Sequence, residues 1–184
     1  MSLHDHLITA LSHQQVSCLC LLDLSAAFDI IDHSILRHRL SSWFGIADSA
    51  ITWFETYLIS RSFSVLASGF ESPPYPLSCG VPQGSVLDSI LFNMFITPLS
   101  SLISSRSLNH HLYADDTQLF ISFAPITFTT AITQLQDTIS DISSWMTANL
   151  LSLNPSKTEF MLIGLPQQYL KSRTLLSPFL QITL

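Results

Sequence analysis

Charged side chains are scarce in this sequence. Asp, Glu, Lys and Arg together account for 11% of its 184 residues, less than half of the roughly 25% that is usual in a soluble domain. Hydrophobic residues make up 47%, and the mean hydropathy is +0.40. A chain with so few charges has large apolar faces, so we expect further parts of a larger body, or another protein, to cover them.

Basic residues are the scarcer of the two charged groups. The chain has 7 Lys and Arg against 13 Asp and Glu, which gives a net charge of −6. It contains no run of basic residues, whereas a protein that grips a nucleic-acid backbone usually shows a basic patch. Any nucleic-acid-binding function has to account for this shortage.

Long hydrophobic runs and metal-spaced cysteines are also missing. The most apolar run, residues 16–22, is far shorter than the ~18 to 20 residues that span a bilayer, so we expect no membrane association. The N-terminus lacks the layout of a signal peptide. Cys18, Cys20 and Cys79 are odd in number and lack metal-site spacing, which favours a reduced, intracellular compartment.

The spacing of apolar residues predicts a mixture of helices and strands. Short or alternating apolar runs predict two strands and two hairpins, at residues 16–23, 157–164, 62–77 and 109–123. A period near 3.6 residues predicts helices at residues 1–15, 33–44, 48–58, 86–102 and 129–148. This order indicates an α+β domain whose helices pack on one face of an antiparallel sheet.

Acidic residues stand at two predicted strand ends. Asp115 and Asp116 occupy the tip of the second hairpin, where a polar turn is the simplest interpretation because Asp is common in turns. Asp23 ends the first strand. If that strand lies beside the hairpin, Asp23 and Asp115 share one site that suits Mg²⁺. Asp29 and Asp32 are expected to cap the following helix rather than to bind metal.

Four segments occur in order and at fitting distances along the chain. They read LLDLSAAFD (residues 21–29), GVPQGSVL (80–87), YADD (113–116) and LNPSKTE (153–159). Together they resemble the palm of a reverse transcriptase of the non-LTR (LINE-type) retrotransposon class. The resemblance covers about residues 16–164, and it implies a polymerase palm-like fold with truncated fingers and thumb. Residues 1–15 would then be the remnant of an upstream helix, and residues 165–184 a truncated C-terminal segment.

The resemblance also implies roles in catalysis. Asp23 and Asp115 resemble the two metal-binding aspartates, and Asp116 resembles their less essential neighbour. Lys157 resembles the lysine near the triphosphate, a candidate general acid for the pyrophosphate leaving group. A solvated lysine at a strand end is an equally good interpretation of Lys157.

Other residues resemble the nucleotide-binding positions of the family. Phe28 resembles the aromatic gate beneath the sugar, where a bulky ring excludes a 2′-hydroxyl, and it can belong to the core at the same time. Gln83 and Gly84 resemble the loop that lines the template and nucleotide pocket, where a small residue permits close backbone approach. Tyr113 either supports the primer end or packs.

The implied activity is RNA-directed DNA synthesis with two Mg²⁺ ions, or Mn²⁺ in their place, on an RNA template, a DNA primer and a deoxynucleoside triphosphate. Asp88-Ser89 stand where the family has Gly-Pro, which places a negative charge near the nucleotide pocket. Because fingers and thumb are absent, we expect little or no polymerase activity from this chain alone. The rival hypothesis is a non-catalytic relic or a co-opted binding module, and a weaker one is another two-metal nucleotidyl transferase.

Overall fold

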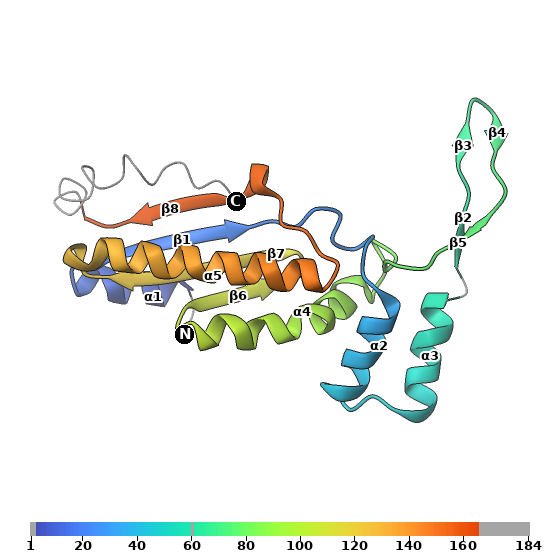
Figure 1. Ribbon diagram of the computed structural model, residues 1–184, viewed down its shortest axis with the longest axis horizontal. Helices are drawn as coiled ribbons and strands as arrows, with labels where there is room; N and C mark the ends of the chain where they lie inside the picture. Colours follow the sequence, from blue (N-terminus) through green and yellow to red (C-terminus); the bar gives the residue numbers. More distant parts are fainter. Residues whose placement is uncertain (1–2, 60, 166–184) are drawn as a thin grey trace.

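The computed structural model describes residues 3–59 and 61–165. Its centre is an antiparallel sheet of four strands in the order β6-β7-β1-β8. Figure 1 shows this sheet on one side of the molecule and a smaller lobe, which carries a protruding hairpin, on the other. The four strands are β1 (Val16–Leu22), β6 (Asn109–Tyr113), β7 (Asp116–Phe123) and β8 (Glu159–Ile163).

Strand β1 lies in the middle of this sheet and is apolar on both faces. It pairs with β7, where Leu22 is opposite Thr117, and with β8, where Leu21 is opposite Glu159. Successive side chains of a strand point to opposite faces. Because nearly every residue of β1 is buried, both faces of the sheet must be covered there.

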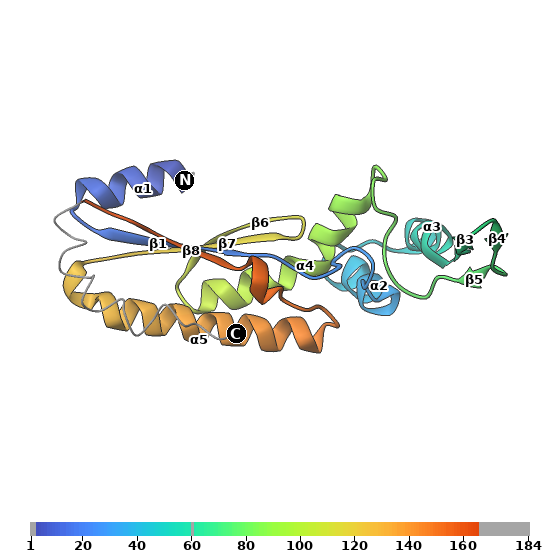
Figure 2. The ribbon, with the colours of Figure 1, turned by 90° about the horizontal axis from the view of Figure 1, so that it is seen from above.

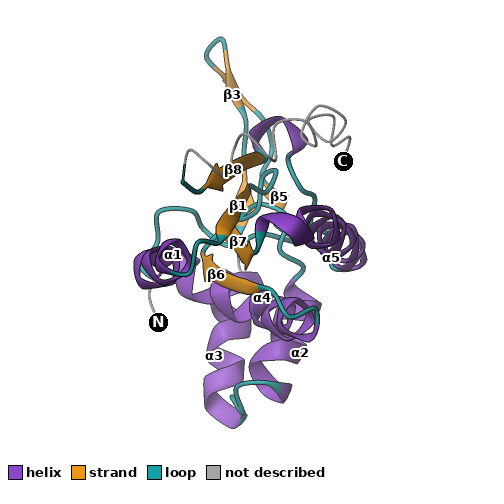
Figure 3. Cartoon of the chain, turned by 90° about the vertical axis from the view of Figure 1, so that its left-hand side faces the viewer, coloured by secondary structure: helices purple, strands orange, loops and turns teal. Residues whose placement is uncertain are grey.

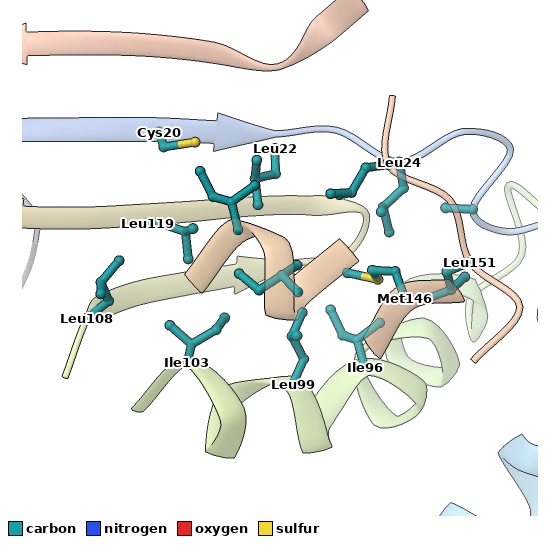
Figure 4. Packing of buried hydrophobic residues seen from close by; sticks show 14 of the residues in the cluster. Cys20, Leu22, Leu24, Ile96, Leu99, Ile103, Leu108, Leu119, Met146 and Leu151 are labelled. Carbon is teal, nitrogen blue, oxygen red and sulfur yellow. The ribbon is translucent and has the colours of Figure 1, made fainter. Parts of the chain in front are cut away.

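Two helices cover one face. They are α4 (Asp88–Ser105) and α5 (Phe128–Ala148). Figure 4 shows Cys20 and Leu22 of β1 directed toward Leu99 of α4, with Met146 of α5 beside them. All four belong to the main hydrophobic cluster, so the core lies between the sheet and these two helices, as the helical periods predict.

Helix α1 (Leu3–Ser12) lies against the opposite face, as Figures 2 and 3 show. Leu19 and Phe120 are buried but lie outside the main cluster, because their side chains point away from α4 and α5. His6 of α1 contacts this face: its ring lies edge-on to Phe120 with centroids 4.9 Å apart, and its Nε2 is 2.9 Å from Ser122 Oγ. Helices α4 and α5 therefore pack on one face of the sheet, as predicted. Helix α1 covers the other face, which the apolar period of its sequence could not predict.

The smaller lobe consists of α2 (His33–Ser42), α3 (Asp48–Ile59) and the protruding hairpin. Asp32 caps α2, since its Oδ1 accepts hydrogen bonds of 2.9 Å from the backbone N–H groups of Ser34 and Ile35. Asp29 was expected to share this role but lies exposed in the preceding turn. The hairpin is confirmed as β2 (Ser62–Phe63), β3 (Leu66–Ala67), β4 (Phe70–Glu71) and β5 (Tyr75–Pro76).

Some element boundaries differ from the sequence-based ones. Helix α4 includes Pro98 and continues to Ser105, whereas the sequence-based prediction ended it at residue 102. Lys157 lies in a short 3₁₀ turn, η2 (Pro155–Lys157), just before β8. A second such turn, η1 (Pro125–Thr127), leads into α5. No helix in the described residues combines the length and the apolar character needed to cross a membrane.

Candidate active site

The strand register brings the predicted acids to one end of the sheet. Leu22 and Thr117 are the last pair of β1 and β7 in this direction. Asp23 follows Leu22, and Asp116 precedes Thr117, so one further step of the antiparallel register sets these two acids opposite each other. The Cα atoms of such pairs lie about 4.5 to 5.5 Å apart. Figure 1 shows β1 ending beside the β6–β7 turn, which carries Asp115.

This turn is held in an unfavourable backbone conformation. Ala114 has a φ of 50°, in the left-handed region that two-residue hairpin turns require and that usually selects Gly or Asn. Its backbone N–H donates a 3.0 Å hydrogen bond to Oδ1 of Asn93 on α4. Helix α4 therefore anchors the turn that carries Asp115.

Asn93 was missed by the sequence analysis. It stands between Phe92 and Met94 in an apolar stretch of α4. A single amide in such a stretch indicates a polar partner across the helix packing. The sequence does not say that this partner is the backbone of Ala114.

Lys157 and Asn154 contact Asp23 from the far side of β1. The Lys157 Nζ atom is 3.2 Å from Asp23 Oδ2. Asn154 Nδ2 donates to the same oxygen at 3.4 Å, and the Asn154 backbone N–H donates to the Asp23 carbonyl at 2.9 Å. The segment before β8 is thus attached to the end of β1. Lys157 is itself largely exposed, with 66% of its side chain accessible against 21% for Asp23.

The donor chemistry at this end of the sheet fits a hard divalent cation. Carboxylate oxygens are the ligands that Mg²⁺ takes, often only one or two of them together with phosphates and water. The ammonium group of Lys157 already supplies a positive charge at Asp23. Within the described residues, no three His, Cys, Asp or Glu side chains form a ready-made metal cluster, so substrate oxygens would have to complete the coordination.

Phe28 and the glycine loop (residues 80–85), which the resemblance assigns to the nucleotide, contact each other. The Phe28 ring packs on Phe92 with centroids 5.1 Å apart, so Phe28 contributes to the hydrophobic core. The Phe28 carbonyl accepts a 2.8 Å bond from the Val81 N–H, and the Gly80 N–H donates to Ile31 O at 2.7 Å. These bonds dock the glycine loop on the segment that follows Asp23.

Gly80 is required by this docking. It has a φ of +85°, and a Cβ atom there would lie 2.7 Å from the carbonyl oxygen of Asp29. The Gly80 carbonyl is also 2.7 Å from Nε2 of His33. His33 therefore contacts a backbone oxygen of the glycine loop.

Asp88 folds back onto the glycine loop. Its Oδ2 accepts a 2.6 Å hydrogen bond from the Gly84 N–H, and its Oδ1 accepts from the Ser89 N–H. The hydrogen bond from the Ser89 N–H, and to a smaller extent the one from the Gly84 N–H, lowers the pKa of Asp88. Gln83 and Gly84 are exposed, and within the described residues they make no hydrogen bond or ion pair with the three predicted carboxylates.

The exposure of Tyr113 bears on the two roles predicted for it. Its side chain was expected either to support a primer or to pack. The residue is 78% exposed, so it does not pack. Its position directly before the acidic turn leaves the ring free to contact a ligand at the end of the sheet.

Comparison with protein families identifies the chain's relatives. Residues 1–176 match the family model described as reverse transcriptase (RNA-dependent DNA polymerase). The chain is 27% identical over 161 residues to a probable RNA-directed DNA polymerase from transposon BS of Drosophila melanogaster. It is 28% identical over 159 residues to the RNA-directed DNA polymerase from mobile element jockey of Drosophila funebris. These alignments cover 85% and 82% of this chain but only 17% and 16% of the relatives.

Solved structures show a similar fold. Apo telomerase from Candida tropicalis, truncated from its C-terminal domain, matches 88% of this chain with a TM-score of 0.62 and 13% identity. Telomerase from Candida albicans, in complex with a TWJ fragment of telomeric RNA, matches 86% with a TM-score of 0.65 and 13% identity. The chain corresponds to 35% and 30% of those two proteins, and the likeness concerns the fold.

Proposed function

This chain belongs to the reverse transcriptase (RNA-dependent DNA polymerase) family, and we propose that it forms the palm active site of an RNA-directed DNA polymerase that works with two divalent ions. The observation that supports the proposal is the strand register, which puts Asp23 and Asp116 one step beyond the Leu22–Thr117 pair, with Asp115 in the adjoining β6–β7 turn. These acids come from strands that are distant in sequence, and the family motifs contain them.

The proposed chemistry is the attack of a primer 3′-hydroxyl on the α-phosphate of a deoxynucleoside triphosphate. Two Mg²⁺ ions at such a site stabilise the attacking and the leaving oxygen. Asp23 and Asp115 would hold them, with Asp116 as an auxiliary carboxylate. Mn²⁺ has the same preference for oxygen ligands and would serve in their place.

The remaining residues would act on the nucleotide. Lys157 already lies against Asp23, so its ammonium group can neutralise phosphate charge and donate a proton to the leaving pyrophosphate. Phe28, fixed on Phe92, would form a rigid floor under the sugar and exclude a 2′-hydroxyl. Tyr113 and the exposed Gln83-Gly84 backbone would contact the primer and the template.

We propose that the whole activity depends on further domains of a longer protein. The chain spans 17% and 16% of the length of the two fly relatives. An RNA template, a DNA primer and a deoxynucleotide are the proposed partners of the complete enzyme. We therefore expect divalent-ion binding from the 184-residue chain, and little or no polymerisation by it alone.

Manganese binding tests the site without requiring turnover. The dissociation constant for Mn²⁺ would be measured by electron paramagnetic resonance for the wild type, Asp23→Asn and Asp115→Asn. Loss of one of two ligand carboxylates should weaken binding at least about tenfold, which is about 1.4 kcal/mol. Asp137→Asn, an exposed acid on α5, serves as the matched control. Unchanged affinity in both site variants would overturn the proposal.

Primer extension tests the expected dependence on further domains. Extension of a DNA primer on an RNA template by the purified chain, abolished by Asp23→Asn, would support the active site and contradict the expected inactivity. A non-catalytic binding role is the second candidate, favoured by the 74% and 82% exposure of Leu66 and Phe70 on the hairpin. Absence of Mn²⁺ binding together with a stoichiometric protein complex would establish that role instead.

A further inference from the structure

Three flat side chains, two on helix α3 and one just beyond its end, contact one another. The Trp53 and Tyr57 rings are stacked, with centroids 5.5 Å apart and an interplanar angle of 11°. The Arg61 guanidinium carbon lies 4.5 Å from the centroid of the same Tyr57 ring. Trp53 and Tyr57 are one helical turn apart and share a face of α3, while Arg61 lies beyond the end of the helix at Ile59 and contacts the same Tyr57 ring. We call these three side chains the α3 ladder.

The Trp53 end of the α3 ladder is exposed, and the half-buried Arg61 end carries a positive charge. Trp53 is 54% exposed although its ring is large and apolar. Arg61 Nε donates to the Tyr57 carbonyl at 2.8 Å, and no carboxylate pairs with Arg61 in the part of the chain that the structure describes. Its positive charge is therefore uncompensated, whereas the nearby Arg37 is paired with Glu55.

The α3 ladder is connected to the glycine loop. The Tyr57 hydroxyl donates a 3.1 Å hydrogen bond to Ser85 Oγ, and Ser85 ends that loop. The loop is the segment to which the proposed function assigns the template and the nucleotide. A strand lying on the ladder would thus be continuous with the proposed active site.

We propose that the α3 ladder binds single-stranded nucleic acid, as the path by which the template strand reaches the glycine loop. A base would stack on Trp53, which extends the Trp53–Tyr57 stack, while Arg61 would contact a phosphate. Stacking of bases on aromatic rings is the usual way in which proteins hold single strands without reading their sequence. The identification of the strand as a template rests on the proposed function; the binding itself does not.

The shape and charge of the ladder favour a nucleic acid over a protein. The ladder places a stack of π surfaces beside a cation that no carboxylate in the described residues neutralises, a combination that suits a base and its phosphate. Trp, Tyr and Arg also occur at protein interfaces, and the tests below separate the two occupants. The net charge of the chain is −6, so stacking on the rings would have to supply most of the affinity, and Arg61 a single phosphate contact. A single phosphate contact predicts a shallow salt dependence, with a log–log slope of roughly −0.7 for a single strand.

Fluorescence anisotropy with a labelled single-stranded RNA oligonucleotide tests the proposal. The titration is made in EDTA, so that it does not depend on the metal site. Trp53→Ala should weaken binding at least about fivefold, the lower range for losing one base stack. Arg61→Gln should weaken it and flatten the salt dependence. Trp43→Ala, another tryptophan with 51% exposure but outside the ladder, should have no effect.

A spectroscopic readout separates ligand contact from loss of folding. A variant with Trp43→Phe and Trp145→Phe retains Trp53 as its single tryptophan, because the chain has 3 tryptophans. Stacking of a base should quench its fluorescence in step with the anisotropy. The proposal would be overturned if the wild type did not bind the oligonucleotide. It would also be overturned if the fluorescence were quenched but Trp53→Ala bound with unchanged affinity.

The outcomes also distinguish this proposal from the proposed function. If Mn²⁺ binding fails but oligonucleotide binding depends on Trp53, only the catalytic assignment is lost. If the Trp53→Ala variant binds RNA normally but loses self-association or binding to a purified protein, the ladder is a protein-docking face and the proposal is wrong. Circular dichroism of each variant verifies its fold.

Discussion

The Lys157 ammonium nitrogen lies 3.2 Å from the Asp23 carboxylate oxygen Oδ2, so a cation from the segment before β8 rests on the acid at the end of β1. This contact makes Asp23 a shared ligand: a divalent ion that binds it has to compete with the ammonium group or displace it. The exposure of Lys157 makes such displacement easy.

Removing this ammonium group should strengthen metal binding. Lys157→Gln is expected to lower the Mn²⁺ dissociation constant by up to about fivefold, the range for an exposed ion pair. Isothermal titration calorimetry would measure it. Arg106→Gln breaks the ion pair with Asp141 on α5. It is the control and should leave the Mn²⁺ dissociation constant unchanged. Weaker Mn²⁺ binding in Lys157→Gln would show that the lysine supports the ion site instead.

Asn93 should position the acidic turn. In Asn93→Ala the Ala114 N–H loses its acceptor, which should cost about 1 to 3 kcal/mol and weaken Mn²⁺ binding. Asn93→Asp keeps an acceptor oxygen and should restore protection of the Ala114 amide in hydrogen exchange. Equal exchange rates in the wild type and Asn93→Ala would refute the positioning role.

Gly80 and Gly69 have similar backbone φ angles, so comparing their alanine variants separates the cost of a left-handed backbone from the cost of a steric clash. Gly80→Ala adds a Cβ atom 2.7 Å from the Asp29 carbonyl, while Gly69→Ala, at a φ of +82° against +85°, meets nothing within 4 Å. Gly69→Ala should lose about 1 kcal/mol from the left-handed backbone, and Gly80→Ala several kcal/mol because the loop must shift. Urea unfolding would compare them, and equal losses would exclude the close approach at Gly80.

The Asp88 carboxylate should lower nucleotide affinity. It occupies the Gly84 N–H group in the loop assigned to the nucleotide. Asp88→Asn removes the charge and should tighten binding of a fluorescent deoxynucleoside triphosphate analogue in the presence of Mg²⁺. Asp48→Asn, in the first turn of α3, is the comparison. A weaker complex with Asp88→Asn would mean that the loop closed by Asp88 is the binding-competent one.

His110 should make stability depend on pH. Burial lowers its pKa, with the neighbouring His111 acting in the same direction and a backbone hydrogen bond of Leu108 opposing it. The folded state therefore favours neutral His110. Its contribution to stability is present above the ordinary histidine pKa of about 6.5 and is lost as the pH falls through the lower, folded-state pKa.

Thermal unfolding between pH 7.5 and 5 would measure this effect. His110→Gln should show a smaller fall in Tm over that range than the wild type. The exposed His38 provides the matched variant, and His38→Gln should keep the wild-type slope. Identical slopes for all three proteins would assign the pH dependence to other groups.

Much of the fold was predictable because local patterns determine it. The apolar period of α5 predicted its ends within a residue or so, and the alternation around Asp115 predicted the β6–β7 hairpin. The relationship to reverse transcriptases of the non-LTR class is confirmed by the family model and the fly relatives. Four short motifs were enough to predict this family relationship, because each combines a polar residue with the end of a helix or strand.

Contacts between distant segments were decided only by the tertiary structure. The sequence alone determined that Asp23 ends a strand and that Asp115 lies in a turn. The register of β1 against β7 and β8 then set Asp116 and Lys157 on either side of Asp23. The packing of α4 brought Asn93 to Ala114, and that of α3 brought Tyr57 to Ser85. Local propensity acts over a few residues, whereas these contacts depend on how whole elements bury their apolar faces against each other.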